Sequence, residues 1–319
     1  DNVPVEVSPN PDAQISAPVH QIMLVVHGIY LLENLKHDEL AAKGVHEFAF
    51  RERLRSLGWI PGNNLTIEYR WADGKYERLH DLAAELVRLN VTAIFANSGV
   101  AAIAAKKATA SIPIIFEMIG DPVASGLIVS LGQPGGNITG VAGLGRELST
   151  KQLELLKEIV PKLGRIGLLA NPENTISAAT IRETRQAATA HGVQVEVLNI
   201  RAPGDLDAAF ENLSKTSVGA MMVAADPLLT SHRKRILDFA ARKRLPAMYY
   251  VSLWVPDGGL VSYSASQPEQ FRKSATLVNK VFNGTKPADL PVEQPTKFEL
   301  VINLKAAKQI GVTIPPGVC

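Results

Sequence analysis

The stretch VTAIFANSGVAAIAAKKATASIPIIFEMIGDPVASGL, residues 91–127, contains two short apolar runs that each end in a turn sequence. The first run, residues 91–96, leads into Asn97-Ser98-Gly99 and an alanine-rich helical pattern. The second run, residues 112–119, leads into Gly120-Asp121-Pro122 and a further segment of small residues. Continuous apolar runs of this kind are typical of strands buried on both faces of a parallel sheet. The stretch therefore predicts a parallel α/β sheet.

Polar residues follow both predicted strands at the point where a ligand site is expected. Ligands of open parallel sheets bind beyond the carboxyl ends of the strands, which is where Ser98 and Asp121 lie. A helix that begins near Val100 would direct free backbone N–H groups at Ser98 and Gly99, and such groups favour an anion such as a carboxylate. Turn formation and capping are the alternative interpretation of both tripeptides. Their repetition at successive strand ends favours a binding site.

Length and composition limit the class of protein. A chain of 319 residues indicates two domains, and its 46% apolar and 20% charged residues are ordinary for a globular protein. The net charge of +2 comes from scattered Lys and Arg, so no nucleic-acid partner is expected. Cys319 is the single cysteine, which excludes an internal disulfide and a cysteine-built metal site.

Residues 1–18 are not expected to belong to a folded core. The sequence begins with Asp1, so we expect a processed or engineered product, and no signal peptide is visible. Residues 1–18 contain four prolines among polar residues. They predict an extended leader.

The remaining pattern predicts one β/α layout twice, with a break near residues 140–150. Residues 27–43 give no clear pattern. The first half predicts strands over 21–26, 64–71, 91–96, 112–119 and 138–142, and helices over 46–57, 77–89 and from residue 100. The second half predicts strands over 165–170, 193–200, 218–224, 246–250, 259–264 and 297–303. Its helices are predicted over 150–160, from the turn 171–175 to residues 191–192, from 205, and over 230–243, 270–282 and 304–310. The pairs Ser149–Gln152 and Ser266–Glu269 read as capping boxes.

Two similar open sheets in tandem, and not a closed barrel, fit this layout. Polar residues at the strand ends of the two halves are then expected to face each other across a cleft, a usual place for ligands of hinged α/β domains. These residues are Ser98 and Asp121 from the first half, with Asn171, Asn174, Asp226 and either Tyr249 or Tyr250 from the second.

The sequence contains no motif that indicates catalysis, a cofactor or a metal. A GxSxG elbow and a Walker A loop are absent, and Gly143-Leu144-Gly145 lacks the third glycine of a dinucleotide fingerprint. The histidines show no HExxH spacing. Asp121 and Asp226 could act as an acid–base pair, although neutralising a ligand cation is the simpler role. We therefore expect no enzyme, no cofactor and no metal site.

Four pieces carry a resemblance to a known family: FRERLRSLGWIPGNNLTIEYRWADGKYERLHDLAAELVRLNV, IPIIFEMIGDPVASGLIVSLGQPGGNITG, LSTKQLELLKEIVPKLGRIGLLANPEN and LPVEQPTKFELVINLKAAKQIGVTIPP. They closely resemble the TrpX-like substrate-binding proteins of ABC transporters, in the same order and spacing, over about residues 46–317. The resemblance implies the type I periplasmic-binding-protein fold, which has two Rossmann-like open parallel-sheet lobes joined by a hinge.

Three crossovers between the lobes are implied, near residues 140–148, 262–267 and 290–296. The N-terminal lobe is expected to comprise 19–141 plus 265–292. The C-terminal lobe is expected to comprise 142–264 plus 293–319, and its last strand and helix are the weakest part of this assignment.

The resemblance also implies roles for the strand-end residues. By position, Ser98 and Gly99 are implied as carboxylate contacts, and Asp121, Asn171, Asn174 and Asp226 as further ligand-binding residues. Tyr249 is a further candidate on its strand-end position alone. Asp226 is the candidate for the ligand ammonium. The sequence departs from its relatives at residues 27–32, HGIYLL, where they usually have a small polar turn. Tyr30 in this segment is either an aromatic wall of the site or core filling.

The function implied is that of an exported solute receptor. It would bind a small carboxylate-bearing solute, expected to be an amino acid, and characterised relatives bind aromatic ones. It would present the solute to the membrane subunits of an ABC permease, as a periplasmic or extracytoplasmic monomer, with lipid anchoring left open. The alternative is the sensing domain of a transcription regulator that has lost its DNA-binding part, and a metabolic enzyme is third. A signal peptide or a helix-turn-helix in the unprocessed gene product discriminates the first two.

Overall fold

The computed structural model describes residues 20–26, 48–72, 76–143 and 145–318. The chain divides into two compact units, each made of two segments. Unit 1 is Asp1–Ala142 with Gln267–Gln294, and unit 2 is Gly143–Ser266 with Pro295–Cys319. The chain therefore passes from one unit to the other after Ala142, after Ser266 and after Gln294. The predicted leader, residues 1–18, and segment 27–43 lie outside the described residues.

Unit 1 contains a five-stranded parallel sheet in the order β2-β1-β3-β4-β5. The strands are β1 (His20–Val26), β2 (Leu65–Trp71), β3 (Ala93–Ala96), β4 (Ile114–Ile119) and β5 (Ile138–Ala142). Residues 48–56 are helical, and the other helices are η1 (Tyr76–Arg78), α2 (Leu79–Arg88), α3 (Gly99–Ala108), α9 (Gln267–Phe282) and η3 (Pro287–Asp289). All five strands run parallel because helical or loop segments return the chain to the same end of the sheet each time.

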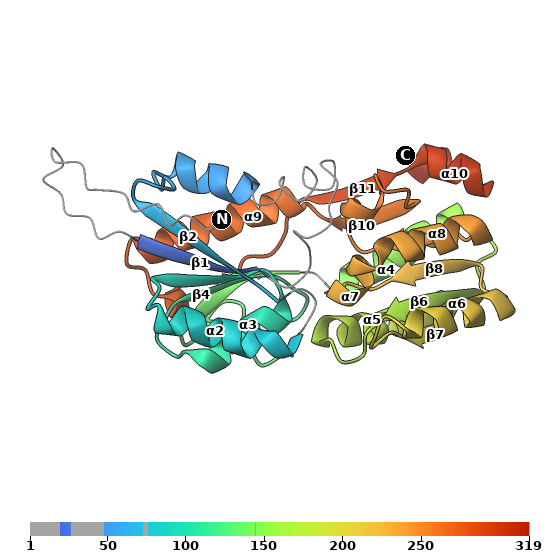
Figure 1. Cartoon of the computed structure of the whole chain (residues 1–319). Coiled ribbons are helices and arrows are strands. Elements are labelled where there is room, and N and C mark those ends of the chain that lie inside the picture. Colours follow the sequence, from blue (N-terminus) through green and yellow to red (C-terminus); the bar gives the residue numbers. More distant parts are fainter. Residues whose placement is uncertain (1–19, 27–47, 73–75, 144, 319) are drawn as a thin grey trace, which may run out of the picture. The chain divides into compact units, whose positions relative to one another are not determined.

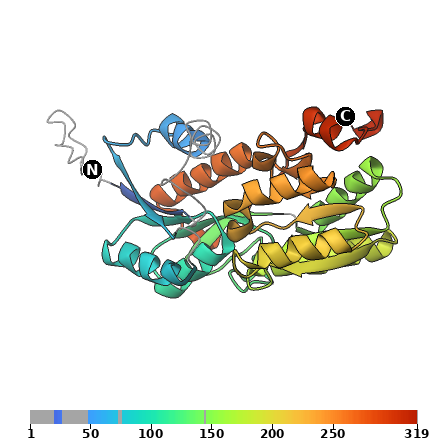
Figure 2. The same ribbon diagram turned by 45° about the vertical axis from the view of Figure 1, so that its right-hand side comes forward.

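The helices of unit 1 cover both faces of its sheet. Side chains of α2 and α3 form one core with Ile114 and Phe116 of β4, whereas α9 and residues 48–56 form a second core with Ile115. Both views place α9, in orange-red, on the opposite face of the sheet from α2 and α3, in cyan and teal (Figures 1 and 2). Alternate residues of a strand point to opposite faces, so an uninterrupted apolar run such as Ile114–Phe116 fills both cores.

Aromatic contacts and one glycine set the packing of the α9 face and of β5. Phe95 of β3 stacks on Phe50 at a centroid distance of 4.7 Å and meets Phe271 of α9 edge-on at 5.9 Å. A Cβ atom on Gly140 of β5 would lie 2.1 Å from the carbonyl oxygen of Phe116. Glycine at this position therefore lets β5 lie close against β4.

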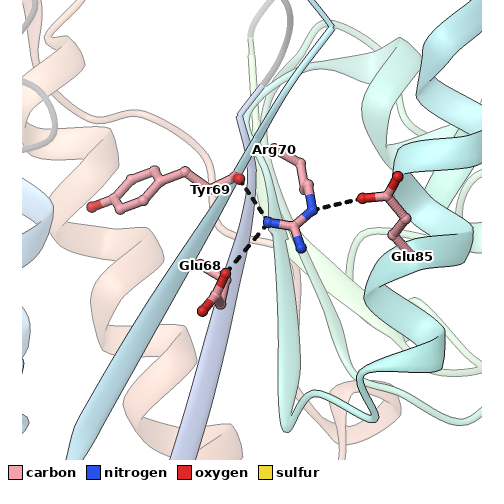
Figure 3. A network of polar contacts seen from close by, with 4 residues as sticks. All are labelled: Glu68, Tyr69, Arg70 and Glu85. Carbon is pink, nitrogen blue, oxygen red and sulfur yellow. Dashed lines mark hydrogen bonds and ion pairs between the residues drawn. The ribbon is translucent and has the colours of Figure 1, made fainter. Parts of the chain in front are cut away.

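A polar network joins the edge strand β2 to helix α2. Figure 3 shows Arg70 between Glu68 and Glu85: its Nε donates to Glu85 Oε2 at 2.9 Å, and its Nη1 donates to the carbonyl oxygen of Tyr69 at 2.9 Å. The contact from Nη1 to Glu68 Oε2 is longer, at 3.4 Å. All these side chains are partly exposed, so the ion pairs contribute no more than about 1 kcal/mol each. They orient the edge strand more than they stabilise the unit.

Unit 2 contains a six-stranded sheet in the order β11-β10-β9-β8-β6-β7. All neighbours are parallel except β11, which is antiparallel to β10. The strands are β6 (Arg165–Ala170), β7 (Gln194–Asn199), β8 (Ala220–Val223), β9 (Ala247–Tyr249), β10 (Val261–Ala265) and β11 (Phe298–Ile302). The helices are α4 (Gly145–Ile159), α5 (Thr175–Ala190), α6 (Asp205–Lys215), α7 (Pro227–Ser231), α8 (Arg233–Lys243), η2 (Ser252–Trp254), α10 (Leu304–Ile310) and η4 (Pro316–Val318).

Two cores flank the sheet of unit 2. Side chains of α4, α5 and α10 form one core, and side chains of α6, α7 and α8 form the other. In the second core Phe210 stacks on Phe239 at 4.3 Å, and Tyr249 stacks on Trp254 at 4.9 Å. Both faces of the sheet are thus covered, as the continuous apolar strands require.

Two sequence-based expectations about helices were wrong. Ser149 does not cap a helix, because α4 already begins at Gly145 and the Ser149 hydroxyl donates to Glu183 of α5 at 3.4 Å. The helix predicted over 230–243 is two helices, α7 and α8, which meet at His232 with φ −104°. In each case tertiary contacts or turn residues override the helical pattern.

Candidate functional site

Ser98 and Gly99 lie directly after β3, at the N-terminus of α3. The Oγ of Ser98 accepts a hydrogen bond from the backbone N–H of Ala101 at 3.3 Å, and the backbone of Ser98 is extended. Ser98 is therefore the N-cap of α3, as the capping interpretation expects. The first N–H groups of any helix lack acceptors within the helix, so this end of α3 also suits a carboxylate.

Asp121 lies after β4 in an exposed turn. Its Oδ1 accepts hydrogen bonds from the backbone N–H groups of Val123 at 3.1 Å and Ala124 at 2.9 Å. The turn is fastened to α3, because Lys106 Nζ donates to the carbonyl oxygens of Gly126 and Leu127 at 2.9 and 2.8 Å. Asp121 thus shapes its own turn and leaves the carboxylate exposed.

In unit 2 the candidate residues after β6 and β8 are brought together. Asn174 caps α5, since its Oδ1 accepts from the N–H of Ile176 at 2.9 Å, and its Nδ2 donates to Asp226 Oδ2 at 2.9 Å. Asp226 caps α7, and its Oδ1 accepts from the N–H groups of Leu228 and Leu229 at 2.8 and 3.3 Å. Asp226 is only 2% exposed. A buried carboxylate held by three hydrogen bonds of this kind is fixed in position.

Further side chains join the same edge of unit 2. Asn171 is buried and its Oδ1 accepts from the N–H of Glu173 at 3.1 Å. Ser177 of α5 donates from Oγ to the carbonyl oxygen of Ala225 at 3.1 Å, which ties α5 to the loop after β8. Sequence reasoning missed Ser177, because a serine one turn inside a helix carries no signal of a contact to a distant loop.

The two adjacent tyrosines at the end of β9 differ in their surroundings. Tyr249 is the last residue of β9, and its ring is 1% exposed and stacked on Trp254. The structure therefore places Tyr249, a candidate ligand contact, in the core, where burial raises the pKa of its phenol. Tyr250 is partly exposed, and burial raises its pKa to about 12. Its hydroxyl lies 2.7 Å from Thr230 Oγ1, so this neutral phenol is linked to α7.

Glu117 of β4 is a buried carboxyl that the site prediction did not include. It is 0% exposed, and neither oxygen has a hydrogen-bond partner among the described residues. Burial raises its pKa well above the ordinary value. The signal was visible in the sequence, since Glu117 is the one charged residue in the apolar run 112–119. Strongly perturbed buried acids are concentrated at functional sites but also occur in purely structural positions.

Three further points concern Tyr30, metal ions and membrane-spanning helices. Tyr30 lies outside the described residues. Within the described ranges no cluster of three or more His, Cys, Asp and Glu side chains could hold a metal ion. No helix in the described part of the chain has the length and apolar character needed to cross a membrane.

Comparison with known proteins gives one family, one curated relative and several structures of similar fold. The family model described as ABC transporter substrate binding protein matches residues 30–319. A protein named tyrosine-binding protein from Clostridioides difficile (strain R20291) is 27% identical over 264 residues, which is 82% of this chain and 75% of that protein.

Two solved structures are similar in fold. One is a conserved domain protein from Vibrio cholerae O1 biovar El Tor, with a TM-score of 0.85 and 24% identity over 94% of this chain and 97% of that one. The other is the ABC domain in complex with L-Trp from Streptococcus pneumoniae, with a TM-score of 0.84, 24% identity and the same two coverages. These likenesses confirm the predicted fold class, that of the type I periplasmic binding proteins.

The match of the family model covers most of the chain, including the strand ends after β3, β4, β6 and β8. The resemblance found in the sequence is confirmed by it. This chain belongs to the family of ABC transporter substrate-binding proteins.

Proposed function

We propose that the chain is an extracytoplasmic receptor that binds an amino acid and delivers it to the membrane subunits of an ABC importer. In this role it would change no covalent bond in its ligand. The observation that carries the proposal is the alignment of polar groups with the carboxyl ends of parallel strands in both units. Open α/β sheets bind small ligands at this end.

The helix N-termini at these strand ends support a ligand with a carboxylate. Helix α3 begins directly after β3, and Ser98 is its N-cap. Its first-turn N–H groups carry partial positive charge, which favours an anion. We assign the ligand carboxylate to Ser98 and Gly99 for this reason, with Asp121 on the neighbouring strand end.

The acidic edge of unit 2 supports a ligand that also carries an ammonium. Asp226 is a buried carboxylate in a fixed position, with Asn174 donating to it at 2.9 Å and Asn171 near the start of the same loop. A buried negative charge attracts a cation more strongly than an exposed one, because water screens it less. We assign the ligand ammonium to Asp226. Because Tyr249 is buried, we propose Tyr250 in its place as a candidate ligand contact.

The relatives support an amino acid, and an aromatic one in particular. One relative is named for tyrosine, and one similar structure holds L-Trp. An amino acid carries both the carboxylate and the ammonium that these two assignments require.

A binding screen tests the proposal. Thermal shift with amino acids, aromatic acids and sugars identifies the ligand, and titration calorimetry then compares the wild type with Asp226→Asn. Losing the charge opposite a desolvated ammonium costs roughly 2–5 kcal/mol, so amino-acid affinity should fall by about one and a half to three and a half decades. Analogues that lack the amino group should lose far less.

Asp205→Asn is the matched control. Asp205 also accepts hydrogen bonds from two backbone N–H groups, those of Arg201 at 2.7 Å and Ala202 at 2.9 Å, but it is the partly exposed first residue of α6 and lies outside the candidate set. Its substitution should leave ligand affinity unchanged. If the wild type prefers a ligand without an amino group, or if Asp226→Asn binds the amino acid unchanged, the role given to Asp226 is wrong. Turnover of the bound ligand would contradict the receptor role.

A further inference from the structure

Tyr250 is anchored at two points on the carboxyl edge of the unit 2 sheet. It directly follows β9, and its ring meets Trp254 edge-on at a centroid distance of 6.2 Å and an interplanar angle of 72°. Its hydroxyl is 2.7 Å from Thr230 Oγ1 in α7. A ring fixed at its side and at its tip has little rotational freedom to lose when something packs on it.

The hydrogen bonds around Thr230 determine the direction of the contact with Tyr250. The Thr230 hydroxyl lies 2.9 Å from the carbonyl oxygen of Asp226, and a carbonyl can only accept, so the single Thr230 proton is donated there. The Tyr250 hydroxyl therefore donates to Thr230 Oγ1. Because its proton is used within the protein, Tyr250 cannot donate to an incoming group, which it meets with the surface of its ring and the acceptor side of its hydroxyl oxygen.

At least one face of the Tyr250 ring is not covered by Trp254. In an edge-to-face pair only one face of one ring is in contact, and Trp254 also stacks nearly parallel on Tyr249, at 16°. Tyr249 and Trp254 are fully buried, whereas Tyr250 is partly exposed. The three rings form a rigid aromatic group of which Tyr250 is the outer member.

We propose that Tyr250 is a specificity-determining residue, whose anchored ring is a platform for a flat aromatic side chain of the ligand. This inference rests on the proposed solute-binding role of the same strand ends and deepens it. Aromatic rings gain from offset or edge-on packing against each other beyond the area they bury. An aliphatic side chain buries area on such a platform without that additional gain.

The test compares aromatic and aliphatic amino acids on one variant. Titration calorimetry measures the affinities of L-tryptophan, L-phenylalanine and L-leucine for the wild type and for Tyr250→Leu. The aromatic–aromatic contribution corresponds to roughly a 2- to 12-fold change in affinity, so Tyr250→Leu should weaken both aromatic ligands by this factor relative to L-leucine. The decisive quantity is the ratio of affinities, which a general loss of folded protein does not alter.

Two further variants separate the ring from its anchor and from a general aromatic effect. Tyr250→Phe keeps the ring and the contact with Trp254 but loses the hydrogen bond to Thr230, so it should keep most of the aromatic preference. Tyr263→Leu is the matched control, because Tyr263 of β10 is also partly exposed and stacked on an aromatic ring, Phe298, at 5.9 Å. It should leave the ratio at the wild-type value.

The outcomes distinguish this inference from the proposed function. If Tyr250→Leu and Tyr263→Leu give the same aromatic-to-leucine ratio, the platform is overturned and the amino-acid receptor stands. The platform is also overturned, and the amino-acid receptor stands, if the wild type binds L-leucine but neither aromatic amino acid. If it binds indole-3-propionate as tightly as L-tryptophan, in a manner that depends on Tyr250, the platform stands and the amino-acid assignment falls. Binding of none of these probes overturns both.

Discussion

The Asp-Pro pairs that follow β4 in unit 1 and β8 in unit 2 have the same local sequence pattern and the same pair of local hydrogen bonds, although only the second begins a helix. Asp121 accepts hydrogen bonds from the N–H groups two and three residues later, at 3.1 and 2.9 Å. Asp226 accepts from the residues at the same spacing, at 2.8 and 3.3 Å. A short acidic side chain before a proline turn makes these contacts wherever it occurs.

The two carboxylates differ in everything beyond their own loop. Asp121 is exposed, whereas Asp226 is 2% exposed and also accepts from Asn174, a residue 52 positions earlier in the chain. Losing the same capping contact costs more free energy when it is buried, because water cannot reach a buried donor that has lost its acceptor. The comparison shows that one local motif can serve as a simple turn in one unit and as part of a connected polar edge in the other.

The largest effect is expected for Asp226→Ala. This variant removes the cap of α7 and the acceptor of Asn174 Nδ2, so the free energy of unfolding should fall by about 2–4 kcal/mol. Urea unfolding followed by circular dichroism measures it. Asp121→Ala, which removes an equivalent pair of local contacts at an exposed position, is the matched comparison. Equal losses in the two variants would show that the buried contact with Asn174 contributes nothing.

Glu117 of unit 1 can be compared with Asp226 of unit 2. Both carboxyl groups are buried, but Glu117 has no hydrogen-bond partner among the described residues. Burial raises its pKa above the ordinary value of 4.5, so the folded chain keeps a proton that the unfolded chain releases. The contribution of Glu117 to stability should therefore be full below about pH 4.5 and fall as the pH rises toward its folded pKa, by up to about 1.4 kcal/mol per pH unit.

Glu117→Gln tests this expectation, since the amide cannot ionise. Urea unfolding at several pH values should show a shallower loss of stability with rising pH in the variant than in the wild type. Glu85→Gln is the control, because this carboxylate belongs to the partly exposed network of Arg70 in the same unit. A wild-type and a Glu117→Gln profile that run parallel would mean that Glu117 is not held as the neutral acid.

The smallest effect is expected for Asp121→Ala itself. Loss of an exposed capping side chain costs about 0.5–1 kcal/mol, and water can replace the lost acceptor. The difference is measured as a small shift of the unfolding midpoint at constant slope. A loss as large as that of Asp226→Ala would reveal an interaction of Asp121 beyond its own turn.

Most strands and helices were predictable from periodicity alone. The run Ile114–Phe116 and the amphipathic α2 are clear because each buries a continuous or regularly spaced apolar face. The errors fall where a distant residue decides the outcome. Ser149 looks like a helix cap in sequence, but its hydroxyl meets Glu183 from another helix. No local pattern carries that information.

The candidate site was predictable in position but not in detail. Strand ends followed by small and polar residues identified Ser98, Asp121 and Asp226. The pattern could not reveal that the Tyr249 ring turns into the core while its neighbour Tyr250 remains partly exposed. Which of two adjacent aromatic residues faces inward depends on where β9 ends and on the position of Trp254, both set by packing.

The sequence by itself determined the class of fold, the family, the cap at Ser98 and the turn at Asp121, because these depend on apolar periodicity, ordered motifs and side chains that bond within a few residues. Only the tertiary structure decided which polar groups are buried and joined. Asn174 and Asp226, or Thr230 and Tyr250, become partners because parallel strands bring their carboxyl ends to one edge of a sheet. Burial then removes water from these contacts. For this reason a buried side chain differs from an exposed one of the same type in its pKa and in how much it contributes to the stability of the fold.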